Sequence, residues 1–372
     1  MVQPKTLAEI QEVCANSQRL LPVGAGTKSS LSTSQSGDVT VLDMRAYSGI
    51  VSYDASEFLI TVRGGTTISE LSDALSAQRQ YLPFDPVFSS RGATIGGSIA
   101  SGISGPCRLL YGGLRDFMLE VALCNSAGRE IRGGGKVVKN AAGFDLPKLL
   151  VGSYGRMGVI TEATLKVFPS PQGWLTLRCE ARSLAAALDT GLKLLALPLP
   201  IAALELEQPA TLLVRLAGPL DSLSGMAQRV IAQVGPREQI ALIQGGTDET
   251  KMWADRSEFA WAASAATLVR VAVAHHDCRA LCAALEKLGT AVQYVISCGA
   301  SVVWISTSSL EELAALDKSL SELKLAGVVI CGARGLTLLG DTRWVSTAER
   351  IRLALDSDQK LLSYAEQGSA SL

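Results

Sequence analysis

Apolar residues recur at helical spacing in two short segments near the start of the chain, 6–17 and 67–78. Each segment opens with a threonine that is followed three residues later by a glutamate, the pattern of a capped helix N-terminus. Stretches rich in β-branched and apolar residues predict strands at 19–23, 39–45 and 58–65. The beginning of the chain is therefore predicted to be a small α/β unit.

Glycine becomes frequent between residue 83 and about residue 170. Within this part, 117–124 and the following REIRGG predict a β-hairpin, and 158–168 predicts another strand. The stretch PSPQG at 169–173 has the composition of a linker. We therefore expect a first domain over residues 1–170, made of two α/β subdomains.

Strands and amphipathic helices alternate after this linker. Helices are predicted at 183–196, 221–234, 277–288 and 310–323, with apolar strands between them. The resulting β–α–β–β–α–β order predicts an α+β domain over 171–331. Residues 332–372 are predicted to form a tail with a helix around 347–355, which returns to the first domain.

Composition excludes several classes of protein. The chain has 372 residues, is 48% hydrophobic and 19% charged, and carries a formal net charge of −1. These values are typical of a globular protein of two or three domains, without the basic stripe of a nucleic-acid-binding protein. The most apolar long stretch, 184–206, contains charged residues and prolines, so we expect no integral membrane segment and a cytoplasmic location.

The 8 cysteines contain no C-x-x-C pair, which gives no support for an iron–sulfur or zinc site in this chain. The two histidines, His275 and His276, are predicted at the end of a strand, where neighbouring side chains point apart. This arrangement is poor for binding one metal ion. We therefore predict no metal site.

The glycine-rich loop PVGAGTK at 22–28 follows a short strand, as a phosphate-binding loop would. Its spacing fits neither a Walker loop nor the G-x-G-x-x-G fingerprint of a nicotinamide cofactor site. A second group, ATIGG at 93–97 and SGISGP at 101–106, also offers bare backbone. Successive backbone N–H groups in such loops bind anionic oxygen, so the two groups together could hold a pyrophosphate, although tight turns alone would also explain them.

In their order along the chain these motifs, with YGGLRDFMLEV and GGGKVVKNAAGFDLPKLLVGSYGRMGVITEATLKV after them, resemble a known family. The chain is similar to the FAD-binding module of the vanillyl-alcohol oxidase / p-cresol methylhydroxylase (PCMH) superfamily. Within that superfamily it looks most like the E subunit, the FAD-binding subunit, of bacterial glycolate oxidase. The resemblance implies an α+β protein in which a PCMH-type FAD-binding domain is followed by a smaller ferredoxin-like cap domain.

The resemblance implies a cofactor site as well. Residues 23–28 match a loop on the pyrophosphate, and residues from 94 to 105 match segments along the ribityl chain and the flavin ring. Arg115 and Asp116 match a pair that braces the loop, and residues 158–160 match the strand start at the adenine end. The implied FAD-binding residues are Val23, Gly24, Ala25, Gly26, Thr27, Lys28, Thr94, Ile95, Gly96, Gly97, Ser101, Gly102, Gly105, Arg115, Asp116, Gly158, Val159 and Ile160. The phosphates are expected to be held by backbone amides rather than by a catalytic lysine.

Some features of the family's catalytic members are missing. Several members attach FAD covalently through a histidine near these loops, but both histidines here lie in the second domain, so FAD is expected to be non-covalent. The histidine-rich metal motif and the arginine-bearing turn of the tail are absent, and of the tail motif only Asp356 remains. Catalytic residues stay unassigned. Arg108, Arg215 and Arg334 are carboxylate-binding candidates whose place relative to the flavin the sequence does not give.

The leading hypothesis is an FAD-binding subunit of a glycolate or D-lactate oxidising complex. Its expected partners are a catalytic flavoprotein subunit, an iron–sulfur subunit and a small 2-hydroxy acid, with peripheral membrane association only through those subunits. A self-sufficient FAD-dependent 2-hydroxy-acid dehydrogenase is the first alternative. A non-catalytic scaffold that kept the flavin fold is the second.

Overall fold

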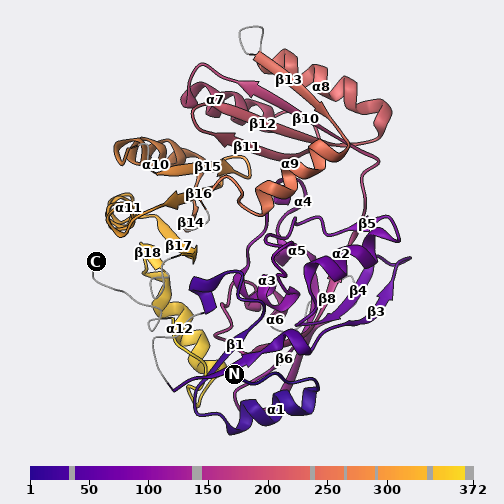
Figure 1. Cartoon of the computed structure of the whole chain (residues 1–372), viewed down its shortest axis with the longest axis vertical. Coiled ribbons are helices and arrows are strands. Elements are labelled where there is room, and N and C mark those ends of the chain that lie inside the picture. Colours follow the sequence, from indigo (N-terminus) through magenta and orange to yellow (C-terminus); the bar gives the residue numbers. More distant parts are fainter. Residues whose placement is uncertain are drawn as a thin grey trace.

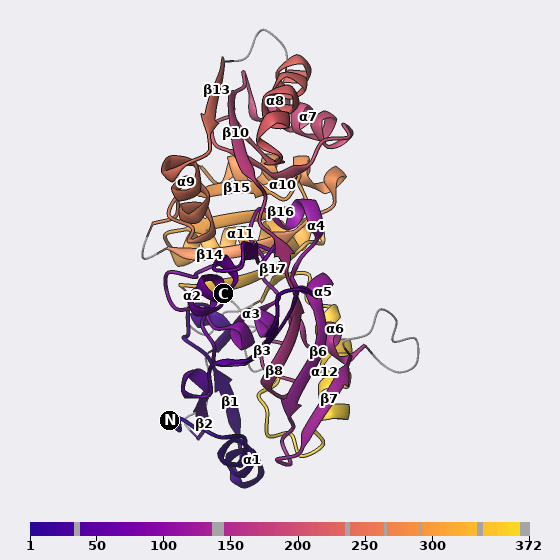
Figure 2. The ribbon, with the colours of Figure 1, turned by 90° about the vertical axis from the view of Figure 1, so that its right-hand side faces the viewer.

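The chain folds into two stacked lobes (Figure 1). One lobe holds the N-terminal part and the last helix, and the other holds one large sheet with its helices. Seen from the side, the lobes make an elongated molecule with the large sheet at one end (Figure 2). The computed structural model describes residues 1–32, 38–135, 145–234, 239–263, 266–289, 292–332 and 338–364.

The first lobe contains a small parallel sheet and a five-stranded antiparallel sheet. Up to the linker its elements are α1 (Leu7–Asn16), β1 (Leu20–Val23), the 3-10 helix η1 (Ser29–Ser32), β2 (Thr40–Asp43), η2 (Met44–Ala46), β3 (Ile50–Asp54), β4 (Leu59–Arg63), α2 (Ile68–Ser76), β5 (Gln80–Tyr81), α3 (Ile95–Ser101), α4 (Arg108–Tyr111), α5 (Leu114–Phe117), β6 (Met118–Cys124), β7 (Glu130–Gly134), α6 (Leu146–Leu150), β8 (Val159–Lys166) and β9 (Phe168–Pro169).

Both threonine caps form as the sequence predicts. Thr6 Oγ1 accepts the backbone N–H of Glu9 at 3.2 Å, and Thr67 Oγ1 accepts that of Glu70 at 3.1 Å. The five-stranded sheet has the order β3-β4-β8-β6-β7, and β6 and β7 form the predicted hairpin. These local signals were sufficient because each depends on neighbours within a few residues.

The second lobe is built on a nine-stranded sheet. Its elements are β10 (Gly173–Glu180), α7 (Leu184–Leu195), β11 (Ile201–Glu207), β12 (Thr211–Gly218), α8 (Leu220–Val234), β13 (Gln239–Gln244), α9 (Thr247–Ser257), β14 (Thr267–Ala272), α10 (His275–Lys287), β15 (Gln293–Ser297), β16 (Val302–Thr307), α11 (Leu310–Leu323), β17 (Ala326–Cys331) and β18 (Leu338–Gly340).

The strand order shows that this lobe contains two ferredoxin-like units rather than one. The order is β13-β10-β12-β11-β15-β16-β14-β17-β18, so each β–α–β–β–α–β unit has its fourth, first, third and second strands side by side. The units join where β11 pairs antiparallel with β15, through Leu206 and Ile296. Each unit thus covers an edge strand of the other, which leaves fewer unpaired backbone groups.

The two faces of this sheet pack against different partners. Helices α7, α8, α10 and α11 cover one face and form a core with alternate strand residues such as Val269 and Val271. The other face turns toward the first lobe, where Leu268 and Trp304 join a core that contains Phe88 and Ile99. Because side chains alternate along a strand, Arg270 lies on this second face.

Two secondary-structure expectations were wrong, and one helix was missed. The segment ATIGG is the start of helix α3 and not a loop, because Thr94 caps it and Gly96 lets it approach the backbone of Gly64. His275 and His276 begin helix α10 and are exposed, whereas a strand end was expected. Helix α9 was not predicted, since its weakly apolar sequence hides the buried Trp253.

The last described segment, 356–364, lies against the beginning of the chain. Helix α12 (Trp344–Leu355) is followed by Leu361, which pairs beside β1 at Leu20. Lys360 Nζ donates to the carbonyl oxygens of Ala15 at 2.7 Å and Ser126 at 3.1 Å.

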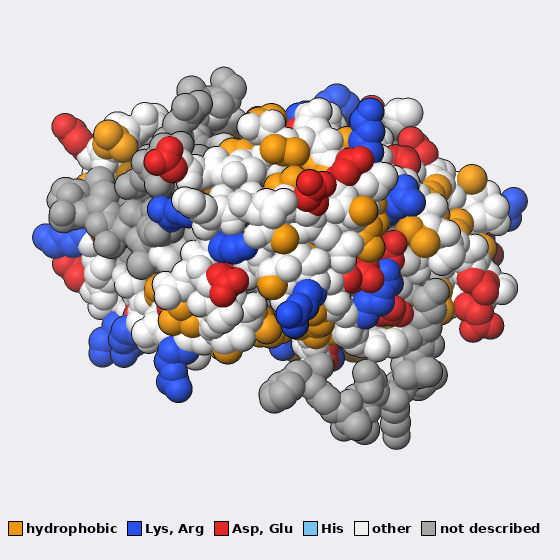
Figure 3. Space-filling view, turned by 90° about the horizontal axis from the view of Figure 1, so that it is seen from below, with side chains coloured by type: hydrophobic (Ala, Val, Ile, Leu, Met, Phe, Trp, Pro, Cys, Tyr) orange, Lys and Arg blue, Asp and Glu red, His pale blue; other side chains and the backbone are white. Residues whose placement is uncertain are grey.

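Within the described ranges, no helix is long and apolar enough to cross a membrane. The face seen from below carries charges of both signs interspersed (Figure 3).

Candidate cofactor site

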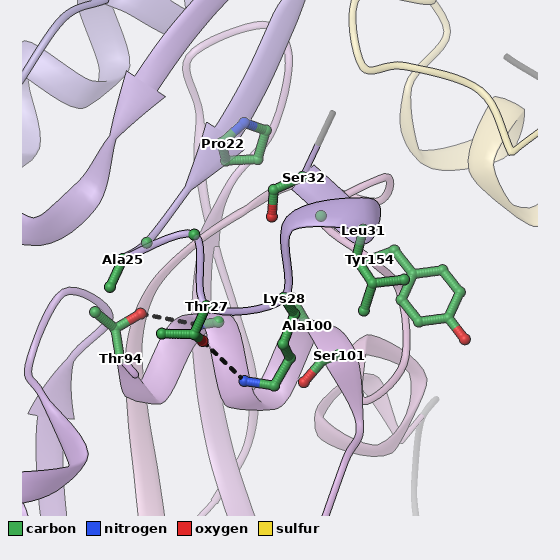
Figure 4. Close-up of a pocket in the computed structure, with 14 residues that line it drawn as sticks. Pro22, Ala25, Thr27, Lys28, Leu31, Ser32, Thr94, Ala100, Ser101 and Tyr154 are labelled. Carbon is green, nitrogen blue, oxygen red and sulfur yellow. Dashed lines mark hydrogen bonds between the residues drawn. The ribbon is translucent and has the colours of Figure 1, made fainter. Parts of the chain in front are cut away.

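A cavity lies between the loop after β1 and helix α3 (Figure 4). Its walls come from three places that are far apart in sequence: the first glycine loop with η1, helix α3, and the turn before β8. The lining residues are Pro22, Gly24, Ala25, Gly26, Thr27, Lys28, Leu31, Ser32, Thr94, Gly97, Ala100, Ser101, Tyr154 and Gly155.

Because glycine has no Cβ atom, the two glycine segments can pack closely against each other. A Cβ atom at Gly24 would collide with Thr94 Oγ1, the same atom that caps α3 by accepting the backbone N–H of Gly97 at 3.2 Å. Gly26 has φ +66°, and a Cβ atom there would meet nothing within 4 Å. Bare backbone therefore faces the cavity, as close approach to a ligand requires.

A second cavity continues the first. The two share Pro22, Gly24, Thr94, Gly97, Ala100 and Gly155. The second is lined further by Val23, Met44, Gly64, Gly96, Gly158 and Ile160. The joined space is long, with a lysine and hydroxyl groups at one end and aliphatic side chains at the other. This shape and polarity fit an elongated dinucleotide that carries phosphates.

Most of the sequence-predicted FAD-binding residues line one of these cavities, and six do not. Ile95 and Val159 point into the core, and Gly102 ends α3 with φ +65°. Gly105 donates its backbone N–H to the carbonyl oxygen of Asp85 at 2.6 Å. Arg115 and Asp116 lie on α5, where Asp116 accepts the Gly113 N–H at 2.9 Å. These six are structural neighbours of the cavity wall.

Lys28 is the charged side chain of the cavity lining, and only 5% of its surface is exposed. Its Nζ lies 3.5 Å from Thr27 Oγ1 and 5.6 Å from the ring centroid of Phe88. Burial, reinforced by the charge of Arg91, lowers the pKa of Lys28 to about 8. Near neutral pH and without a bound anion, the ammonium form of Lys28 is therefore only weakly favoured over the neutral amine.

One arginine, Arg270, lies near a residue of the cavity wall, and a second, Arg108, lies near the first. Tyr154 lines the cavity, and Arg270 of β14 is close enough for its charge to lower the pKa of Tyr154, which burial raises. Burial lowers the pKa of Arg270 itself, and the charge of Arg108 lowers it further. In the described part of the chain, no carboxylate forms an ion pair with either arginine. Sequence reasoning missed Arg270, because only strand alternation and the packing of the lobes bring it here.

The other arginine candidates have different surroundings. Arg215 Nε and Nη2 donate to the two carboxylate oxygens of Glu249 at 2.8 and 2.9 Å, and its guanidinium stacks 3.9 Å from the ring centroid of Trp174. Both members of this ion pair are buried, so Arg215 joins α9 to the sheet and is not free to bind a ligand. Arg334 lies outside the described residues.

Among the described residues, no three His, Cys, Asp or Glu side chains gather as a metal site would need. Both histidines are at the start of α10 and away from the cavity lining. The cavity therefore offers backbone amides, one lysine and hydroxyl groups, with Arg270 near its wall and Arg108 near Arg270. This set suits an anionic, partly aromatic ligand.

Known proteins with a similar sequence or fold indicate the class of cofactor. Residues 1–134 match the FAD binding domain family. A solved structure of alkyldihydroxyacetonephosphate synthase superimposes with a TM-score of 0.72, covering 96% of this chain and 74% of that one at 15% identity. The first part of the chain therefore matches an FAD binding domain, the superposition shows a similar fold, and FAD is the cofactor, as the sequence predicted.

Curated relatives narrow this further. The chain is 39% identical to glycolate oxidase subunit GlcE of Escherichia coli (strain K12) over 198 residues, 53% of this chain and 56% of that protein. It is 32% identical to glycolate oxidase subunit GlcD of Bacillus subtilis (strain 168) over 248 residues, 64% of this chain and 52% of that protein. A probable mitochondrial D-lactate dehydrogenase of Danio rerio matches at 26% identity, over 74% of this chain and 56% of that protein. The chain thus spans about half the length of the curated relatives it matches.

Proposed function

We propose that the chain is the FAD-binding subunit of a complex that oxidises glycolate or D-lactate and passes the electrons to partner subunits. The similarity to glycolate oxidase subunits and D-lactate dehydrogenases supports the reaction class. The observation that carries the proposal is Arg270, whose charge acts on Tyr154 of the cavity wall, together with Arg108, whose charge acts on Arg270. Two cations without a described carboxylate partner fit the carboxylate of a 2-hydroxy acid.

The residues of this chain have separate tasks in the proposed reaction. Arg270 and Arg108 bind and orient the acid, and the partly buried Tyr154 lies between Arg270 and the rest of the cavity lining as a neighbour of both. The flavin, when bound, supplies the hydride acceptor. Oxidation also needs a base for the hydroxyl proton. The described part of the chain brings no histidine to the cavity, so we assign this task to a partner subunit.

Anaerobic visible spectra of the purified chain test the proposal. Glycolate or D-lactate, and oxalate as a non-reacting dicarboxylate, are added to the chain alone and to the chain with its co-purified subunits. We expect oxalate to shift the flavin spectrum in both preparations. We expect the acid to bleach the flavin only when the partner subunits are present.

An arginine substitution makes this test specific. Arg270→Met should abolish the oxalate shift, whereas Arg178→Met, at an exposed position of β10, should leave it unchanged. Bleaching of the chain alone would replace the proposal with a self-sufficient dehydrogenase. A colourless protein that does not take up FAD would identify a scaffold, and an unchanged oxalate shift in Arg270→Met would reject the carboxylate site.

A further inference from the structure

Lys28 is buried in the cofactor cavity without a counter-charge in contact. No acidic side chain of the described ranges reaches within 4.0 Å of its ammonium, and the one polar contact of the ammonium within those ranges is Thr27 Oγ1 at 3.5 Å. A buried ammonium without an anion is costly, and a protein keeps one where a ligand or a change of protonation relieves the cost. The lysine directly follows the bare backbone of Gly24–Thr27 and lines the same cavity.

Three charged or titratable groups face Lys28 from the elements packed around it. Arg91, in the loop before α3, lowers the pKa of Lys28, while Glu258 after α9 and Cys331 at the end of β17 raise it by smaller amounts than burial lowers it. Glu258 Oε1 already accepts the backbone N–H of Ser90 at 2.8 Å. These neighbours therefore do not neutralise the lysine.

We propose that Lys28 supplies the counter-charge for the diphosphate of FAD, and that binding of the cofactor is coupled to uptake of a proton by this lysine. The proposal depends on the FAD-binding domain alone and holds whichever acid the complex oxidises. It adds a specific electrostatic anchor to the backbone amides of the glycine loop. It also makes cofactor affinity depend on pH, because only the ammonium form attracts the diphosphate.

The size of the effect follows from the titration of the empty site. With a pKa of about 8, the charged fraction of Lys28 falls from about nine tenths at pH 7 to about one tenth at pH 9. A bound diphosphate raises the pKa of the lysine, so affinity is greatest below pH 8 and weakens as the pH rises through that value. The expected loss of FAD affinity between pH 7 and pH 9 is about tenfold.

The full chain, stripped of flavin, is titrated with FAD, with ADP and with riboflavin at pH 7, 8 and 9. FAD and ADP share the diphosphate, whereas riboflavin has only the ring system and the ribityl chain. We expect the tenfold loss for FAD and ADP and none for riboflavin. Calorimetry of ADP binding at pH 8 in buffers of different ionisation enthalpy should show an uptake of about half a proton per ligand.

Variants separate charge from side-chain packing. Lys28→Met should bind ADP weakly and equally at all three pH values, and Lys28→Arg should keep its affinity at pH 9, because arginine stays charged. Lys318→Met, on an exposed position of α11, is the control and should behave as the parent chain does. Circular dichroism confirms that each variant is folded.

Three results would overturn the proposal. They are an ADP affinity that is equal at pH 7 and pH 9 in the parent chain, a Lys28→Met variant that keeps the parent affinity at pH 7, and a pH dependence that appears with riboflavin instead of ADP. The calorimetric measurement uses the unaltered chain, so it decides the matter even if Lys28→Met does not fold. None of these results depends on substrate oxidation.

Discussion

The contact between Gly24 and Thr94 gives the sharpest prediction for the cofactor site. A Cβ atom at Gly24 would overlap Thr94 Oγ1 and lie 3.3 Å from Thr94 Cβ and 3.4 Å from Thr94 Cγ2. Thr94 cannot move freely, because its hydroxyl caps α3 and its backbone carbonyl oxygen accepts the Ser98 N–H at 2.9 Å. Gly24→Ala therefore has to displace either the loop or the N-terminus of α3.

The magnitude can be worked out from these contacts. Overpacking of this kind costs about 1–3 kcal/mol, and loss of a threonine cap costs about 1 kcal/mol. We expect Gly24→Ala to lower the free energy of unfolding by about 2 kcal/mol. FAD affinity should fall at least about tenfold, because a tenfold loss of affinity corresponds to only about 1.4 kcal/mol of binding free energy.

A double-mutant cycle tests the cause. Thr94→Ala removes the hydroxyl that the new methyl group would hit, so Gly24→Ala should cost much less when combined with Thr94→Ala. We expect a favourable coupling energy of about 1 kcal/mol or more in urea unfolding, well within the range for residues in contact. Gly225→Ala, at an exposed position of α8 with nothing within 4 Å of its Cβ, is the control and should stabilise the chain by about 1 kcal/mol. Additive effects in the cycle would refute the steric reasoning.

Two further predictions concern stability. Glu249→Ala leaves the buried guanidinium of Arg215 unpaired and should lower the free energy of unfolding in urea by about 3–5 kcal/mol. As a control, Asp255→Ala removes an exposed ion pair of the same helix and should cost less than about 1 kcal/mol. Equal losses would contradict the stabilising role of the buried ion pair. Asp43, whose pKa is lowered to about 2 chiefly by hydrogen bonds from Arg45, contributes stability that is complete above about pH 4 and is lost as the pH falls toward 2. Asp43→Asn should remove that slope from a plot of unfolding free energy against pH, and an unchanged slope would show that other carboxyl groups cause it.

Much of the fold was readable from short-range patterns. The threonine caps of α1 and α2, the β6–β7 hairpin and the alternation of helices and strands after residue 173 each depend on a few neighbouring residues. The two glycine segments were also visible, and their order along the chain was enough to indicate FAD. Helix α3 was misjudged because glycine disfavours helices in isolation, and only the close approach to Gly64 explains its presence there.

The sequence by itself therefore determined the class of fold through helix caps and strand patterns, which are local properties, and it determined the cofactor through the resemblance of its ordered glycine motifs to a known family. The tertiary structure decided which charges lie near the cavity and which of them are paired. Lys28 becomes a buried cation only when α3 and β17 close around it, and Arg270 reaches the cavity wall only because β14 turns that face toward the first lobe. Arg215 looks like an equivalent carboxylate-binding candidate in the sequence, but its guanidinium forms an ion pair with Glu249. Burial and charge pairing depend on contacts between distant segments, and no local pattern encodes them.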